Sequence, residues 1–440
     1  MSEPATHVGG AVPGGMEVAG TDGFARTRVG PATYREALRS REFRGLVIAQ
    51  VLSEWGDHIA RVALAALVLD RTDSAFLAVL AFVVSFLPAV FGSALLGGLA
   101  DRWPRKIVLL GCDLGRGLII AVLALLAVGS TPIWVLLLTL LLAEVFSAPF
   151  EAAQRSVVPD ILPQPRLALA GMGLMRVLFQ LDQVIGIALA GVVIYFVDAR
   201  WALLLDSATF GVSFVVLAIT VRWRPASQQT QGTPTTLLQE FRAGFRLVFD
   251  DPALRALVML GWGAAVFIIA PEAVALAYAR HDGAGSAVGA ALMASIPAGA
   301  ALGAYLVGRQ GPLRQVQLLL PLALATCLPL LATCVAPPWE VALGLWFLSG
   351  LGQGFLLPLI GTVNLLAPAH FRGRVNGLAG AGFALASASS FLLAGALADV
   401  TSPPVAVTVA GAVGVGLIGA ARHSWPRGAI RRAAAEVYAG

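Results

Sequence analysis

Charged residues are scarce in this sequence. Asp, Glu, Lys and Arg together make up 12% of the 440 residues, about half of what soluble domains carry. Hydrophobic residues make up 58%, and the mean hydropathy is +0.82. This scarcity excludes an ordinary set of soluble domains. The net charge of +5 is spread over many short segments instead of one basic patch, so no nucleic-acid partner is expected.

Cysteine is also scarce, with three residues in the chain. Cys327 and Cys334 lie in one apolar run, about 10 Å apart along a helix, which excludes a disulfide between them. Cys112 lies alone in another run. The sequence therefore predicts neither a disulfide framework nor a metal centre, and it contains no nucleotide-binding loop. We expect no cofactor, no direct use of ATP and no enzymatic reaction.

The sequence contains many long runs of apolar residues. Each run is long enough to cross the roughly 30 Å of hydrocarbon in a bilayer as a helix. The chain is therefore expected to be an all-α membrane protein. Twelve transmembrane helices are predicted, at residues 45–69, 75–98, 107–129, 133–154, 168–197, 202–221, 253–279, 287–307, 315–336, 340–366, 375–399 and 403–421.

The basic residues lie in alternate connections between these runs. They gather before the first run, in residues 102–106, in residues 222–255 and after the last run. The opposite connections hold only Arg71, Arg200 and Arg280. Because connections rich in Lys and Arg stay in the cytoplasm, we expect a multi-pass plasma-membrane protein with both termini cytoplasmic.

An internal repeat divides the chain. The stretches PDILPQPRLALAG from Pro159 and PAHFRGRVNGLAG from Pro368 share their proline-to-glycine spacing and their ending, at an offset of 209 residues. This offset agrees with the spacing of the runs and predicts two six-helix bundles of related structure. The expected organisation is a disordered N-terminal tail (1–43), a first bundle (44–221), a cytoplasmic linker (222–252), a second bundle (253–421) and a C-terminal tail (422–440).

One turn concentrates four charges within six residues. It reads GGLADRWPRK, over residues 97–106, and the positive-inside rule explains its basic residues but not their order. That order resembles the signature of the major facilitator superfamily, in the loop between its second and third helices. In that family, the acidic residue and its arginines latch the cytoplasmic gate in the outward-open state. The resemblance implies gate roles for Gly97, Asp101, Arg102, Arg105 and Lys106.

Further segments resemble one branch of that family, the enterobactin-exporter-like and macrolide-efflux-like proteins. These segments are EWGDHIARVAL, CDLGRG, LDSATFGVSFVV and FRGRVNGL, so the resemblance covers roughly residues 44–400. The segment CDLGRG adds Asp113 and Arg116 to the gate, and Glu151 is expected to pair with Arg102 or Arg105. The antiporter pattern of the fifth helix is incomplete here, since its proline is missing.

Ionisable residues inside the apolar runs indicate a functional or structural role, because placing each charged side chain in a bilayer costs several kcal/mol of free energy. Glu54, Asp57 and Arg61 fall on one face of the first helix. Arg61 could simply neutralise one carboxylate. Alternatively, two carboxylates beside one arginine leave a spare acid for a proton or a substrate. Asp57 is the expected coupling acid, with Glu54 or Glu144 as substitutes.

Other polar residues within the runs extend this set of proton or substrate candidates. Glu144 lies near the middle of the fourth helix and is a candidate cavity residue. Asp182 is not one of these candidates, because it points away from the polar face of the fifth helix and is expected to contact another helix. The remaining candidates are Arg176 and Gln180 on the fifth helix and Gln353 on the tenth.

Together these features predict a secondary transporter that works by alternating access. The resemblance implies export of a moderately hydrophobic small molecule, such as a drug, an antibiotic or a siderophore-like metabolite, in exchange for protons. A monomer in the lipid bilayer is expected. The alternatives are an uptake carrier or lipid transporter of the same fold, and a non-transporting scaffold or receptor. The identity of the substrate is left open.

Overall fold

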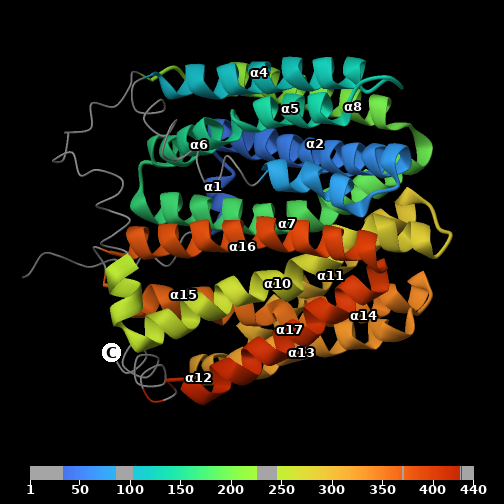
Figure 1. Cartoon of the computed structure of the whole chain (residues 1–440). Helices are drawn as coiled ribbons and strands as arrows, with labels where there is room; N and C mark the ends of the chain where they lie inside the picture. Colours follow the sequence, from blue (N-terminus) through green and yellow to red (C-terminus); the bar gives the residue numbers. More distant parts are fainter. Residues whose placement is uncertain (1–32, 86–102, 225–244, 369–370, 427, 429–440) are drawn as a thin grey trace, which may run out of the picture.

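The structure is a computed structural model that describes residues 33–85, 103–224, 245–368, 371–426 and 428. Every regular element in these ranges is helical, which confirms the all-α class. In Figure 1, the helices up to α8, which we call the first half, lie above those from α10 onward, the second half.

The first half contains one short helix and a series of long ones. They are α1 (Tyr34–Ala37), α2 (Arg41–Thr72), the helix Ala75–Ser85, α4 (Arg105–Leu126), α5 (Ile133–Glu144), α6 (Ser147–Ile161), α7 (Pro165–Phe196) and α8 (Ala199–Thr220). The helix α2 packs against both α7 and α8, and α4 packs against α5, α6 and α8. The helix α2 is therefore the central element of this half.

The second half is built in a similar way. Its elements are α10 (Pro252–His281), α11 (Ser286–Gly308), α12 (Pro312–Gln317), α13 (Leu319–Leu331), η1 (Ala332–Val335), α14 (Trp339–Gly352), η2 (Gln353–Phe355), α15 (Leu356–Leu366), α16 (Arg372–Val400) and α17 (Pro403–Ser424). Here α10 is central and packs against α11, α16 and α17.

Nine helices in the described ranges are long and apolar enough to cross a membrane. Three expected spans fall outside this set. The helix α2 carries several charged residues, the helix Ala75–Ser85 reaches the limit of the described residues, and the helix Leu319–Val335 is short. A multi-pass membrane protein is thus confirmed, whereas the number twelve stays a prediction.

Two local features differ from the sequence expectation. Residues 34–37 and 41–43, placed in the disordered tail, are helical, because Thr33 and Ser40 accept hydrogen bonds from the free backbone N–H groups of the first turns. The fourth expected helix is interrupted between α5 and α6. Pro149 has no N–H to donate to the carbonyl of Val145, which weakens the helix at this point.

The two halves meet at the end of the molecule that carries Asp73 and Gly283, which we call the closed end. Arg280 of the second half donates to the carbonyl oxygen of Leu69 at 2.9 Å and pairs with Asp70 and Asp73 at the end of α2. The rings of Phe82 and Phe391 stack with centroids 5.3 Å apart. The helices α7 and α11 also pack together.

A second contact at the closed end involves Asp399, near the C-terminus of α16. Its carboxylate accepts hydrogen bonds from the Ser74 hydroxyl and the Ala75 N–H, both at 2.6 Å, and from the Phe76 N–H at 3.3 Å. A carboxylate in this place caps the N-terminus of the first-half helix Ala75–Ser85. Charged groups of both halves therefore join the halves here: Arg280 and Asp399 of the second half, and Asp70 and Asp73 of the first.

The hydrophobic core changes along the length of the molecule. One large cluster contains residues of both halves, including Leu64, Val79, Phe267 and Phe391. A smaller cluster contains first-half residues only, from Ala37 to Val221. This smaller core lies at the end opposite the closed end, around the start of α2 and the end of α8.

Candidate functional site

The polar centre of the first half is a cluster of four ionised side chains, which we call the charge cluster: Asp57 and Arg61 of α2, Arg116 of α4 and Glu144 of α5. Arg116 Nη2 donates to Asp57 Oδ1 at 2.6 Å. Arg61 Nη2 lies 3.8 Å from Asp57 Oδ2, and Arg61 Nε lies 3.4 Å from Glu144 Oε1. Arg116 Nη2 is also 3.8 Å from Glu144 Oε2.

The charge cluster is balanced, and three of its four members are buried. It contains two acids and two bases, and the exposed fraction is 8% for Asp57, 4% for Arg116 and 4% for Glu144. The side chain of Arg61 is 21% exposed. Taking such charges out of water costs several kcal/mol for each ion, so they persist inside a protein only when they are paired. The removal of any one member would leave a buried charge without its partner.

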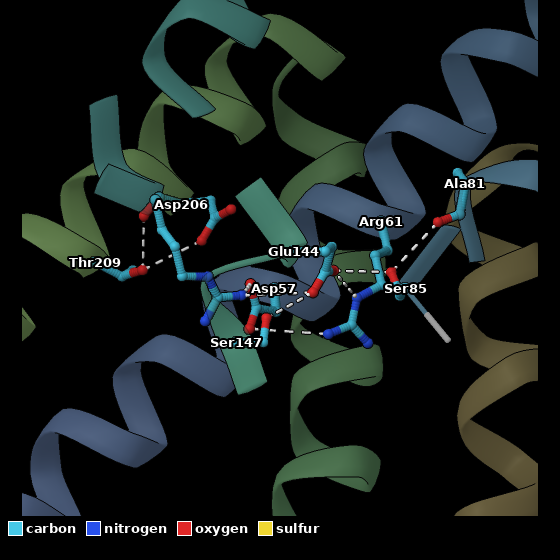
Figure 2. A network of polar contacts seen from close by, with 9 residues as sticks. Asp57, Arg61, Ala81, Ser85, Glu144, Ser147, Asp206 and Thr209 are labelled. Atoms are coloured by element: carbon cyan, nitrogen blue, oxygen red, sulfur yellow. Dashed lines mark hydrogen bonds and ion pairs between the residues drawn. The ribbon is translucent and has the colours of Figure 1, made fainter. Parts of the chain in front are cut away.

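The interrupted helix fixes the position of Glu144. The helix α5 ends at this residue, and α6 begins at Ser147, whose hydroxyl donates to Glu144 Oε2 at 2.9 Å. On the other side, the Ser85 hydroxyl donates to Glu144 Oε1 at 2.8 Å. Figure 2 shows Glu144 between Ser85, Arg61 and Ser147. The break in the helix therefore holds the carboxylate in place with two hydroxyl groups in addition to the arginines.

The expectation of one arginine between two carboxylates of α2 is wrong. Arg116, which the family resemblance placed in the cytoplasmic gate, reaches Asp57 from α4 as a second arginine. Glu54 makes no hydrogen bond or ion pair with a described side chain and stays outside the charge cluster. Asp113 accepts a hydrogen bond from the Ser213 hydroxyl at 2.5 Å instead of pairing with a base. Helical periodicity places residues on one face but does not reveal which neighbouring helix supplies the partner.

Asp206 of α8 is the one buried acid at this site that the sequence analysis did not select. Its exposed fraction is 0%. Figure 2 shows Asp206 and Thr209 beside Asp57, on the side away from Glu144. The sequence held a signal for it, because Asp206 is an acidic residue within an apolar run, the criterion that selected Asp57 and Glu144.

Part of the expected cytoplasmic gate lies outside the described residues, namely Gly97, Asp101 and Arg102. Of the described part, Arg105 pairs with Asp160, and Lys106 Nζ donates to the carbonyl oxygen of Ala218 at 2.7 Å, near the C-terminus of α8. The basic end of the turn thus contacts α6 and α8 within the first half.

The expected pairing of Glu151 with Arg102 or Arg105 stays a prediction, because Arg102 lies outside the described residues and Glu151 does not contact Arg105 in this structure. Glu151 pairs with Arg155, one helical turn further along α6, and both side chains are exposed. Arg105 instead pairs with Asp160, near the end of α6. Residues four apart on a helix are near neighbours, so the carboxylate of Glu151 forms its ion pair with Arg155 on the same helix.

The remaining candidates are distributed over two helices. The side chains of Arg176 and Gln180, on α7, lie outside the described residues. Asp182 accepts a hydrogen bond from the indole N–H of Trp55 at 2.9 Å, which confirms the expected contact between helices. Gln353 lies in η2, is 6% exposed, and its amide nitrogen has no hydrogen-bond partner among the described residues. It is not part of the charge cluster.

Comparison with protein families decides the wider relationship. The sequence model of the family described as Major Facilitator Superfamily matches residues 46–362, which is most of the chain. The chain belongs to this superfamily. The described residues contain no group of acidic, histidine or cysteine side chains suited to a metal ion.

Two curated relatives are efflux proteins. Multidrug efflux pump Tap of Mycobacterium tuberculosis (strain ATCC 25618 / H37Rv) is 26% identical over 364 residues, which cover 80% of this chain and 86% of the relative. Macrolide efflux protein A of Streptococcus pyogenes is 24% identical over 224 residues, which cover 50% of this chain and 54% of the relative. These proteins belong to the branch that the sequence motifs resemble.

Solved structures show the same fold. The crystal structure of peptide transporter POT in complex with sulfate superposes with a TM-score of 0.66 at 16% identity, covering 90% of this chain and 96% of that one. A bacterial homolog to the human lysosomal transporter Spinster, solved in an inward-facing and unoccupied conformation, gives a TM-score of 0.56 at 15% identity, with 92% and 98% covered. At such identities the likeness establishes the superfamily fold alone.

Proposed function

We propose that this chain is a secondary active transporter that exports a moderately hydrophobic small molecule, such as a drug or an antibiotic, in exchange for protons. The observation that carries the proposal is the buried charge cluster, because ionised groups at membrane depth mark ion and substrate pathways. The two relatives described above are efflux proteins, which favours export over uptake.

The proposed architecture is twelve transmembrane helices in two six-helix bundles, residues 44–221 and 253–421, with both termini in the cytoplasm. The chain would work as a monomer. In this orientation the closed end faces the exterior, and the described contacts of Arg280 and Asp399 close the outer side. Alternating access would then require these contacts to break while the turn at 97–106 latches the opposite side.

An open groove between the halves supports an apolar substrate. It has a volume of about 520 Å³, lies between α7, α11 and α14, and includes the exposed side chains of Tyr195 and Phe196. Its lining is almost entirely apolar, and it includes Val184, Ala291, Leu343 and Phe347. Such a surface binds by shape and hydrophobic contact, so it favours moderately hydrophobic molecules over ions or sugars.

The charge cluster supports coupling to protons. Asp57 shares its two oxygens between Arg116 and Arg61, and Glu144 lies against the same two arginines. A proton that neutralises one carboxylate would release an arginine to its other partner. This exchange would change the contacts between α2, α4 and α5 and would leave the charge cluster with one net positive charge while the proton is bound.

Flux measurements in proteoliposomes test the proposal. With an acidic lumen, the wild type should accumulate a radiolabelled macrolide, and a protonophore should abolish the accumulation. Asp57→Asn should lose this uphill accumulation but keep part of the exchange at equal pH, because the substrate groove is intact. Accumulation only with an alkaline lumen would indicate an uptake carrier, and the absence of any flux across a panel of hydrophobic drugs would favour a scaffold or receptor.

Cysteine labelling tests the orientation. In a Cys334→Ser background, since Cys334 is exposed, a cysteine at Gln229 should resist membrane-impermeant thiol reagents in intact cells. A cysteine at Asp282, an exposed residue beyond α10, should react. The reverse pattern would invert the orientation and the direction of transport.

A further inference from the structure

Asp206 is fully buried and has almost no polar partner. The hydroxyl of Thr209 lies 3.4 Å from Asp206 Oδ1, but the same hydroxyl donates at 2.7 Å to the backbone carbonyl of Asp206, so its proton is already used. Asp206 Oδ2 has no hydrogen-bond partner among the described residues. No cationic side chain in the described ranges forms an ion pair with either oxygen.

The backbone of α2 presses against this carboxyl. A side chain at Gly56 would overlap Asp206 Oδ1 and the Thr209 hydroxyl, so only glycine lets α8 approach α2 here. The carboxyl therefore lies in a dry contact between two helices, next to Asp57. An ionised carboxylate without hydrogen bonds costs too much in such a place, whereas the neutral acid does not.

The charges around Asp206 also favour its neutral, protonated form. From α2 it faces Asp57 and Arg61, from α4 it faces Arg116, and from α5 it faces Glu144. Those four groups already balance one another, so an ionised Asp206 would bring an uncompensated negative charge into the site. No charged side chain described on α7, which also packs on α8, adds a cation here.

Arg116 nevertheless offers an unused donor. Its Nε has no hydrogen-bond partner among the described residues, although the guanidinium lies over the ring of Phe210, one turn beyond Asp206 on α8, at 4.5 Å from the ring centroid. A buried N–H without an acceptor is unfavourable. An ionised Asp206 would supply that acceptor and would compete with Asp57 for the same arginine.

We propose that Asp206 is the carboxyl that carries the transported proton, and that the charge cluster senses its presence through Arg116. With the proton bound, Arg116 pairs with Asp57, as in this structure. When the proton leaves for the cytoplasm, the Asp206 carboxylate draws Arg116 away from Asp57, and this movement shifts α4 relative to α2. The inference rests on the proton coupling proposed above and assigns its binding site.

The test compares three purified variants in proteoliposomes with the radiolabelled macrolide. Asp206→Asn, a mimic of the protonated acid, should exchange substrate at equal pH but accumulate no more than without a pH gradient. Asp206→Glu should restore part of the accumulation. Asp182→Asn is the matched control, because Asp182 is also a buried aspartate but bonds to Trp55 and lies outside the charge cluster; it should accumulate like the wild type.

Infrared difference spectra between acidic and alkaline buffer give an independent readout. The wild type should show the carbonyl stretch of a protonated carboxyl, which should be absent in Asp206→Asn, shifted in Asp206→Glu and retained in Asp57→Asn. If the wild type needs no pH gradient, the proposed proton coupling itself fails. If the wild type needs the gradient and Asp206→Asn still accumulates substrate, only the assignment to Asp206 is overturned. Should Asp206→Asn fail to fold, an unshifted band in Asp206→Glu would overturn it equally.

Discussion

The two halves of the molecule each contain an interrupted helix, and the residue at the interruption differs. In the first half, α5 ends at Glu144, and in the second half α14 gives way to η2 at Gln353. These positions are 209 residues apart, the offset of the sequence repeat. Glu144 contacts two arginines and two serines, whereas the Gln353 amide nitrogen has no described partner. The same backbone feature thus holds a charge in one half only.

The neighbourhoods of the two interruptions differ in the same way. At the same offset, the positions of Asp57, Arg61 and Arg116 are taken by apolar residues: Val266, Ala270 and Ala325. Several hydroxyl groups of the second half bond to backbone carbonyl groups instead, as in Ser349 of α14, whose hydroxyl donates to the carbonyl oxygen of Thr326 of α13 at 2.8 Å. We conclude that the described part of the second half has no counterpart of the charge cluster at these positions.

Close packing gives the second half its rigidity. Glycines line the contact between α11 and α14, and a side chain at Gly299, Gly303 or Gly350 would overlap the backbone of the facing helix. Small residues let helices approach closely in a membrane, where the contact rests on van der Waals packing instead of the hydrophobic effect.

The sharpest test of the comparison replaces the residue at each interruption by leucine. Glu144→Leu should lower the free energy of unfolding by about 3–5 kcal/mol, because it leaves two buried arginines with a single carboxylate. Gln353→Leu should change it by less than about 1 kcal/mol, since it removes a buried donor that lacks a partner. Denaturant unfolding in detergent micelles measures both. Equal losses would show that the two interruptions have the same energetic role.

The comparison also shows which features of the fold and the site could be predicted from the sequence. Hydropathy locates the helices, and charges inside apolar runs select Asp57, Arg61 and Glu144, because both signals are local in the chain. The partners are not local. Arg116 lies 59 residues from Asp57, and its motif resembled a gate element, so its place in the charge cluster depends on how α4 packs between helices.

The interruption at residues 145–146 was within reach of the sequence, since a proline disturbs the helix about four residues before it and Pro149 stands at that distance. Asp206 was also within reach, because it is an acid inside an apolar run. Its lack of a partner was not, because the contact with Gly56 arises only when α8 packs on α2.

A smaller loss of stability is expected from a substitution at the contact between α11 and α14 in the second half. Gly303→Val should destabilise the protein by about 1–3 kcal/mol, because the added side chain would overlap the carbonyl group of Leu351 and force α11 away from α14. Gly344→Ala is the control on α14, since its added methyl group meets no atom within 4 Å. Unfolding midpoints in micelles measure the difference. If Gly303→Val unfolds like the wild type, close packing of α11 on α14 does not stabilise the second half.

The smallest effect concerns the closed end, where the second half contributes charge. Asp399 caps the helix Ala75–Ser85 across the interface, and a carboxylate at a helix N-terminus contributes about 0.3–1 kcal/mol. Asp399→Asn should therefore move the equilibrium away from the closed-end conformation by a factor of up to about five, given that 1.4 kcal/mol is tenfold. Spin labels on Asp70 and Glu340, exposed residues of opposite halves, would report this as a larger share of long distances. Asp282→Asn is the matched control, because Asp282 accepts its hydrogen bond from Trp339 within the second half. A distance distribution that changes equally in both variants would mean that the Asp399 cap does not hold the halves together.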